Sequence, residues 1–577
     1  MTLVIGLVLL KNKPATINEA TTNIPSIEKK VMVLNFDPIL ENYGGVRLHE
    51  YFNWNDPSTL EQTYISAMRE VSHEYVNYRI VERQDIDNFP PGLNQFDDAR
   101  YVACVADPTH CKYATMNYST VLSTYQVCEK LNAGTIDELW IWGAPYFGIW
   151  ESNMAGPGAF DINGAPVVGT TCKSKINIMG FSYERGLAEM FENFGHRLEE
   201  TLSRVFVGGK RESIKAIDYN TSSNPWVRFL ASDKYAPNKS GCGSVHSAPN
   251  SDSDYDWDNP TLVSSYCLDW DNPFPMMVGN ASSVNCNTWG CSYDGLGFKK
   301  WWLSHLPHSE GTTNGKLNNW WRYLVEYDKA VSSQGENPQF VTVKSSAEDK
   351  NLACKFVLGK REIYFGLNDS NVSNCPENAP IKAVFDFSKI NIDSKKNVTK
   401  AYLSFIQDGP YDNSLTLSIK LKYGTFTTSS ATWVIDQHWE YKTRVMSPDL
   451  TKQLQEIVDN ALWKPGGTIS AEISYVSGEG NRRVFAYERL GTVTTTTLVY
   501  ETSTTPRPSV SPSVAPSPST SASPSPTASA SPRTGPGDYN GDGCVTLKDY
   551  QLVMTNWGNP YTNADLQLIK ANFGKCY

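Results

Sequence analysis

The sequence lacks any concentration of positive charge. Its 577 residues include 51 lysines and arginines against 61 aspartates and glutamates, and the net charge at pH 7 is −10. No basic stripe is present that could neutralise a phosphate backbone. We therefore expect no nucleic-acid partner.

The sequence also lacks the common catalytic signatures. It contains no HExxH or related zinc motif, no nucleophile elbow, no phosphate-binding loop and no kinase set. It has no apolar run long enough to span a membrane, because the N-terminal TLVIGLVLLKNKPA is too short as it stands. We interpret residues 1–27 as a truncated signal or anchor and a leader.

Cysteine is present, but without zinc-site spacing. Pairs that lie close in sequence fit disulfides of an oxidising compartment: Cys104/Cys111, Cys242/Cys267, Cys286/Cys291 and Cys354/Cys375. The length indicates three or four domains, and 12% aromatic residues with 16 tryptophans suit sandwich cores or sugar stacking. These features predict a secreted, multidomain, extracellular or cell-surface protein.

The last forty residues contain an oxygen-rich loop with calcium spacing. The run from Asp538 to Asp549 reads D-x-N-x-D-G and is closed by an acid at its twelfth position. We expect one calcium ion, held by Asp538, Asn540, Asp542, Cys544, Thr546 and Asp549.

The loop and the segment that follows it are duplicated. The segment from Asp549 to Gly558 is echoed by Asp565 to Gly574, and residues 538–577 resemble the type I dockerin. The resemblance implies a small α-helical calcium-binding domain that docks onto a cohesin-like scaffold domain. The second loop is degenerate, since Met554 and Gly558 offer no side-chain oxygen, and Cys544 could pair with Cys576. The alternative is a structural calcium motif with no docking partner.

Residues 503–537 form a spacer rich in proline, serine and threonine. They contain almost no large apolar residues, so they cannot bury a core. Such a tether would let the preceding domains search a surface while the tail stays attached.

Residues 338–502 alternate apolar and polar side chains between turn signals, which predicts a β-sandwich with one helix over 449–462. The stretch from SATWVIDQHW to TTLVYE, with its PDLT helix and the closing Arg482 and Arg483, resembles the DNRLRE family of jelly-roll modules. The resemblance implies a carbohydrate-binding-like module. Trp433, Trp439 and Tyr441 are candidate sugar contacts, although each is also a candidate core residue.

Residues 28–335 alternate strands with helices, which predicts an α/β body with a parallel sheet. Ligands bind beyond the carboxyl ends of such strands. This rule selects Asp37, Glu151 and Glu184 as candidate catalytic carboxyls for glycosidic bond cleavage. Glu184 could instead complement the dipole of the helix that follows it. Candidate substrate-binding residues are Trp142, Tyr183, Arg185, Trp302 and Trp321.

Two further groups of residues in the body are candidate metal sites. His196 lies among glutamates, but the helical period places it opposite the apolar stripe, on what we predict is a solvated face. The run Asp252 to Asp258 places four acids at alternate positions and is a possible second calcium site, or a plain acidic loop.

The sequence thus predicts a dockerin-bearing protein of a polysaccharide-degrading assembly, with a glycoside hydrolase-type body. The alternative is a non-catalytic protein that binds a polysaccharide or cell-surface glycan. A peptidase or esterase body is a third option.

Overall fold

The structure is a computed structural model, and it describes residues 26–92, 96–111, 115–209, 219, 222–272, 274–333, 335–353, 356–358, 362–368, 376–487 and 495–503, with single positions from 536 onward. The chain divides into two compact units, Met1–Pro508 and Ser509–Tyr577. The first unit contains both predicted folded domains, the α/β body and the β-sandwich.

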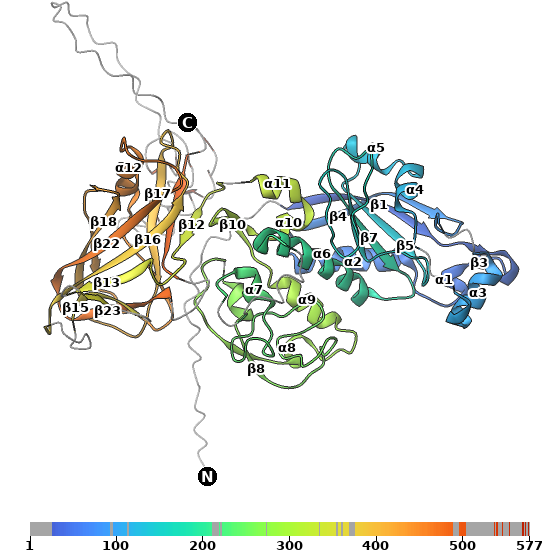
Figure 1. Cartoon of the computed structure of the whole chain (residues 1–577), viewed down its shortest axis with the longest axis horizontal. Helices are drawn as coiled ribbons and strands as arrows, with labels where there is room; N and C mark the ends of the chain where they lie inside the picture. The colour runs from blue at the N-terminus through green and yellow to red at the C-terminus, as the bar shows by residue number, and fades with distance from the viewer. Residues whose placement is uncertain are drawn as a thin grey trace, which may run out of the picture. The chain divides into compact units, whose positions relative to one another are not determined.

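The body is built on a five-stranded sheet (Figure 1). Its strands lie in the order β4 (Val76–Ile86), β1 (Ile27–Phe36), β5 (Glu138–Gly143), β7 (Ile176–Ser182) and β6 (Ser152–Ala155). The first four strands are parallel, as predicted, and β6 runs antiparallel to β7. Strand β5 is buried along its whole length, which explains its continuous apolar run.

Helices cover both faces of this sheet. Helix α2 (Pro57–Val71) and helix α6 (Leu187–Val207) pack on one face together with α9 (Leu296–Ser304). Helices α4 (Tyr118–Thr124) and α5 (Val127–Asn132) lie on the other face (Figure 1). The chain therefore crosses the sheet in both directions, as a doubly wound fold requires.

The second half of the body is rich in loops. Its remaining short elements are α7 (Pro225–Leu230), β8 (Val263–Ser265), β9 (Ser282–Val284), α8 (Cys286–Trp289), β10 (His308–Thr313), β11 (Lys316–Asn319), α10 (Trp321–Val325) and α11 (Tyr327–Ser332). Short elements near the first strands are β2 (Ile39–Leu40), β3 (Val46–Arg47), α1 (Leu48–Tyr51) and α3 (Asp98–Ala106).

Four disulfides are present in the part of the chain that the structure describes. Three are the predicted pairs Cys104–Cys111, Cys242–Cys267 and Cys286–Cys291, and the fourth joins Cys128 to Cys172. The predicted pairs Cys354/Cys375 and Cys544/Cys576 lie outside the described residues. The four bonds favour an extracellular or otherwise oxidising environment.

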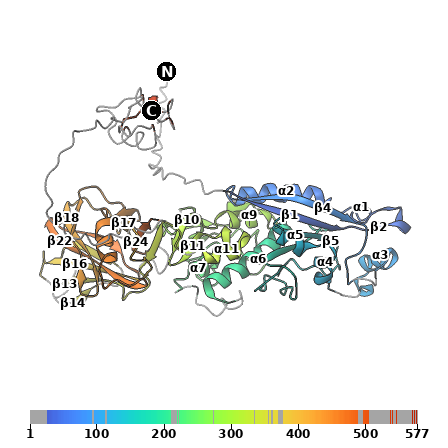
Figure 2. The same ribbon diagram turned by 90° about the horizontal axis from the view of Figure 1, so that it is seen from above.

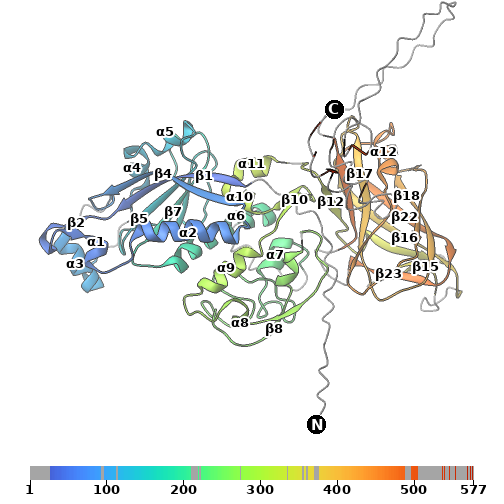
Figure 3. The same cartoon turned by 180° about the vertical axis from the view of Figure 1, so that it is seen from behind.

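The second half of the first unit is a sandwich of two sheets, which Figures 2 and 3 show from two sides. One sheet has the order β11-β10-β12-β24-β17-β21, and the other contains β14-β13-β16-β22-β18-β19, with β15, β20 and β23 attached.

Helix α12 (Thr451–Val458) of the sandwich is shorter than predicted. The strands are β12 (Gln339–Thr342), β13 (Asp349–Ala353), β14 (Phe356–Leu358), β15 (Glu362–Leu367), β16 (Pro380–Ile390), β17 (Val398–Ile406), β18 (Leu415–Tyr423), β19 (Phe426–Thr427), β20 (Ala431–Ile435), β21 (Arg444–Met446), β22 (Gly467–Gly478), β23 (Asn481–Phe485) and β24 (Thr497–Thr502).

The body contributes strands to the first of these sheets. Strand β10, from the body, pairs in parallel with β12 at the start of the sandwich. The side chain of Arg444 on β21 also donates to the backbone carbonyls of Pro275, Met276 and Met277. The two predicted domains are thus joined by a shared sheet.

In the second unit, Val545, Val553 and Ile569 form a small apolar cluster with Tyr539 against it. Among the helices described anywhere in the chain, none combines the length and apolar character needed to cross a bilayer.

Candidate functional site

A pair of adjoining cavities opens beyond the carboxyl ends of β5 and β7. The smaller, of about 200 Å³, is lined by residues 144–149 after β5 and by Gly180 to Ser182 at the end of β7. The larger, of about 580 Å³, shares Glu151, Arg185 and Glu189 with it. The cavities thus lie where the sheet rule predicts a ligand.

The larger cavity has acidic and aromatic walls. One wall comes from the first turns of α6, and the others come from Glu151 before β6, from loops that follow α6 and from α9. The side chains lining it include Glu151, Glu189, Glu192, Tyr255, Trp257, Tyr293, Asp294 and Lys299. Aromatic rings beside carboxyl groups suit a polar ligand with apolar faces.

Helix α6 places three ionisable side chains on one face. Glu189, Glu192 and His196 are spaced by three and four residues, so they lie one above another along the helix. His196 is not on a solvated face, as its sequence environment suggested, because its side chain is only 12% exposed. The polar side of α6 is instead covered by the loop that contains His246.

Close backbone packing holds this loop against α6. The backbone N–H of Val245 donates to Oε1 of the buried Glu199, at 2.9 Å. A Cβ atom on Gly195 would lie 2.4 Å from Cγ2 of Val245, so a larger residue there would displace the loop. The disulfide Cys242–Cys267 ties the same loop to the rest of the body.

The two histidines contact carboxyl groups that line the larger cavity. Nε2 of His246 lies 3.1 Å from Oε1 of Glu192, and Nε2 of His196 lies 3.5 Å from Oε2 of Glu151. The two imidazole rings are edge to face, with centroids 4.7 Å apart. The hydroxyl of Tyr255 lies 3.3 Å from Nε2 of His246.

Among the described residues, one group of three side chains is arranged as metal ligands commonly are. It comprises Glu192, His196 and His246, each of which offers an atom within 4.8 Å of the other two.

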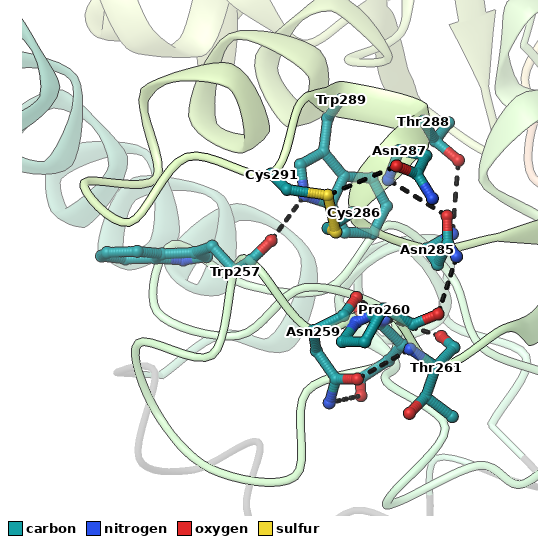
Figure 4. The surroundings of a disulfide bond; sticks show 11 residues. Trp257, Asn259, Pro260, Thr261, Asn285, Cys286, Asn287, Thr288, Trp289 and Cys291 are labelled. Atoms are coloured by element: carbon teal, nitrogen blue, oxygen red, sulfur yellow. Dashed lines mark hydrogen bonds between the residues drawn. A yellow bond between two sulfur atoms is a disulfide. The ribbon is translucent and has the colours of Figure 1, made fainter.

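Lys299 orients the carboxylate of Glu192. Its ammonium group lies 2.7 Å from Oε2 of Glu192 and 4.2 Å from the centre of the Trp257 ring. The loop that contains Trp257 is itself fixed, because the indole N–H of Trp289 donates to the Trp257 carbonyl beside the disulfide Cys286–Cys291 (Figure 4).

The carboxyl groups in the cavity differ in acidity. Burial, together with the nearby charges of Glu189 and Glu192, raises the pKa of Glu151 to about 7. Burial also raises the pKa of Glu189. Burial opposes ionisation of Glu192 as well, but the contacts with His246 and Lys299 outweigh it and lower the pKa of Glu192 to about 2. One cavity thus contains both a readily protonated carboxyl group and one that contacts with His246 and Lys299 favour in its ionised form.

The structure brings together some of the predicted site residues. Glu151, Glu184 and Arg185 all line the smaller cavity. Glu184 is exposed, and its carboxylate is held by the guanidinium group of Arg185 at 3.0 Å. Asp37 does not line either cavity, and it is buried in a short contact with the imidazole of His49. Asp37 is therefore not part of this pair of cavities.

The predicted substrate-binding aromatics need correction. Trp142, Tyr183, Trp302 and Trp321 are fully buried in the core of the body, so none presents a ring face to a sugar. Their apolar surface packs in the core. The aromatic side chains that line the larger cavity, Tyr255, Trp257 and Tyr293, come instead from loops. In the sandwich, Trp433 and Trp439 are core residues and Tyr441 is half exposed.

Of the two predicted calcium sites, the structure describes the loop from Asp252 to Asp258 but only Asp538 among the expected ligands of the C-terminal loop. The acids from Asp252 to Asp258 do not converge: Asp254 accepts from Ser247, while Asp256 accepts from the backbone of Asp252 and from Asn259. Their loop instead carries Tyr255 and Trp257 into the larger cavity. Of the C-terminal loop, Asp538 is described and buried, whereas Asn540, Asp542, Cys544, Thr546 and Asp549 lie outside the described residues.

Sequence reasoning missed His246, Tyr255, Trp257 and Lys299 as members of one site. The spacing of Glu192 and His196 by one helical turn was a local signal for part of it. No local pattern connects His246 to that helix, because fifty residues separate it from His196 along the chain.

Comparisons with known proteins identify no family for this chain. No family model matches it, and no curated protein does. Among solved structures, one match is a carbohydrate-binding module, CBM28, specific for non-crystalline cellulose. It is 12% identical, covers 22% of this chain and 70% of that one, and has a TM-score of 0.14, which is too low to support any conclusion about fold or function.

Proposed function

We propose that the body is a hydrolase that cleaves O-glycosyl bonds of a polysaccharide outside the cell. The observation that carries this proposal is the cavity, in which Glu151 and Glu189 line the same acidic and aromatic pocket. Most glycoside hydrolases use two carboxyl groups that flank the glycosidic bond to be cleaved.

The proposed chemistry divides the two proton transfers between these groups. One carboxyl group takes a proton from the attacking water, and the other protonates the leaving oxygen. Trp257, Tyr255 and Tyr293 would position sugar rings against the carboxyl pair. Arg185, which contacts Glu189 at 3.2 Å, would fix the position of the Glu189 side chain, whose pKa is raised by burial.

The other parts of the chain would serve attachment. In this proposal the sandwich is a carbohydrate-binding-like module, and residues 538–577 are a dockerin-like domain that binds calcium and a cohesin-like scaffold domain. The support is the alternating pattern of 338–502 and the calcium spacing of Asp538 to Asp549 in the sequence.

The catalytic part is tested with the full chain. We would measure the release of reducing ends from a panel of plant and bacterial polysaccharides, for the wild type and for the Glu151→Gln and Glu189→Gln variants. Release by the wild type and its loss in both variants is expected. If the wild type releases nothing from any substrate yet binds a glycan as well as the variants do, the protein is a non-catalytic glycan-binding protein and the hydrolase proposal fails.

The attachment part is tested by calcium titration calorimetry. The full chain should bind one calcium ion that a chain ending at residue 537, and the Asp542→Ala variant, do not bind. Equal calcium binding by all three chains would contradict a calcium-binding tail.

A further inference from the structure

We propose that Glu192, His196 and His246 bind a divalent transition-metal ion, with zinc as the first candidate. The three side chains come from one helix and one loop of the body, and one of them, Glu192, lines the larger cavity. The inference concerns a site that neither the sequence motifs nor the proposed carboxyl chemistry requires.

The spacing of the ligand atoms suits a small tetrahedral ion. Zinc binds histidine nitrogen and carboxylate oxygen at about 2.0–2.2 Å, so two of its ligand atoms lie about 3.3 Å apart. Here Nε2 of His246 and Oε1 of Glu192 are 3.1 Å apart. A ring nitrogen of His196 lies within 4.8 Å of a ligand atom of each of the other two residues, so a small closure of the site would bring all three into the zinc range.

Neighbouring groups hold the three ligands in place. Lys299 contacts Oε2 of Glu192, which leaves Oε1 directed at His246. Glu199 holds the backbone next to His246, and Gly195 allows the loop to approach the helix closely. Supporting contacts of this kind orient the ligands in many metal sites.

The ligand set indicates which ions should bind. Two imidazoles and one carboxylate suit zinc and similar transition metals, whereas calcium and magnesium prefer oxygen ligands alone. Three protein ligands leave a fourth position for water, as in catalytic zinc sites. Glu151 contacts His196, Tyr255 contacts His246, and both line the cavity, so they would lie near a water bound to the ion.

This placement deepens the proposed function and rests on it for its catalytic part. A water held at the open position would lie beside Glu151, which would accept its proton as the water oxygen bonds to the anomeric carbon. The glycosidic C–O bond breaks, and Glu189 gives its proton to the leaving oxygen. The two carboxyl groups thereby exchange protonation states, and solvent restores them.

Metal binding is measured on the full chain after treatment with a chelator. Zinc is titrated by calorimetry in buffer that contains calcium, and cobalt(II) is titrated by visible absorption, which reports tetrahedral coordination. We expect one ion per chain, and a loss of affinity of at least about 100-fold in His196→Ala and His246→Ala. His438→Ala is the matched control, because His438 also contacts a carboxylate, Asp412, but belongs to no group of three ligands.

A measurement on the unmodified chain covers the case in which a variant does not fold. In the cobalt-loaded wild type, proton NMR should show shifted, exchangeable N–H signals from two coordinated imidazoles. Absence of these signals, or equal metal binding by the wild type and both histidine variants, would overturn the proposal.

The two proposals fail in different ways. Sugar release that continues after chelation would remove the metal from catalysis and leave the hydrolase proposal intact. Metal binding that the histidine variants lose, without sugar release from any substrate, would establish the site and contradict the hydrolase.

Discussion

The body and the sandwich each bury an arginine completely, but they stabilise it differently. Arg197 in the body is paired with the buried carboxylate of Glu138 at 2.8 Å. Arg482 in the sandwich donates to the backbone carbonyls of Tyr411, Asn413 and Gln437, and its guanidinium lies over the ring of Trp439.

The pKa values of the two arginines reflect this difference. Burial opposes the charge of Arg197, but Glu138 outweighs burial and raises the pKa of Arg197. Burial lowers the pKa of Arg482, and the charges of Asp412 and Asp436 only partly offset it. The body thus places ionised pairs in its interior, whereas the sandwich keeps such pairs nearer its surface and fills its core with aromatic and aliphatic groups. We expect substitutions of charged residues to have larger effects in the body.

The largest expected effect is on catalysis in the body. Glu151→Gln keeps the shape of the side chain but removes its ability to transfer a proton, so the rate of sugar release should fall about 100- to 10,000-fold. Asp386→Asn, in the sandwich pair with Lys350, is the control and should keep the wild-type rate. Equal rates of sugar release in the two variants would contradict the assignment of catalysis to the body.

The next largest effect concerns the buried pair in the body. Glu138→Gln leaves the Arg197 charge buried without its carboxylate, and the free energy of unfolding should fall by about 3–5 kcal/mol. Glu362→Gln, in the partly exposed sandwich pair with Arg483, should lower it by about 1 kcal/mol or less. Urea unfolding followed by tryptophan fluorescence compares the two, and equal losses would contradict the contrast.

Removing a disulfide should also lower the free energy of unfolding, by an amount that grows with the length of the loop that the bond closes. Replacing Cys128 and Cys172 by serine opens a 44-residue loop, which should lower stability by about 4 kcal/mol, against about 2 kcal/mol for the five-residue separation of Cys286 and Cys291. Thermal unfolding of the two double variants without reductant measures the difference. A larger loss for the shorter loop would show that packing around Trp257 and Trp289, rather than loop closure, dominates.

The smallest effect is expected for Glu472 of the sandwich, which contacts two partly exposed lysines. Burial alone would raise the pKa of Glu472, but hydrogen bonds from Lys422 and Lys382 outweigh it, so the pKa is lowered. A lowered folded-state pKa stabilises the fold above the unfolded value of 4.5, and this stabilisation is lost as the pH falls. Glu472→Gln should therefore lower stability by less than about 1 kcal/mol at pH 7, and by still less at pH 3.

Unfolding curves of the wild type and Glu472→Gln at the two pH values check this prediction. A difference that grows toward acid pH would contradict it.

The sequence allowed the local features of the body to be predicted. Apolar runs gave β1, β5 and β7, and the rule for the carboxyl ends of parallel strands placed Glu151, Glu184 and Arg185 at one cavity. Disulfides between neighbours, such as Cys104–Cys111, followed from spacing. These features depend on contacts within or between adjacent elements.

The rest depends on contacts between distant segments. Helical periodicity suggested that the polar face of α6 is solvated, but it could not show that the loop at His246 covers that face. Composition left open whether the tryptophans stack on sugars or fill a core, and it could not show that Trp302 and Trp321 pack inside. The Cys128–Cys172 bond was missed for the same reason, since its 44-residue separation has no local signature.

The pairing of β10 with β12 limits where the chain can be truncated. A fragment ending at residue 335 would leave the backbone groups of β10 without their neighbouring strand. It would also lose the guanidinium group that binds the carbonyls of Pro275 to Met277. An uncovered strand edge readily captures another chain, so such a fragment should aggregate on expression. A recombinant product that retains residues 26–503 avoids this problem.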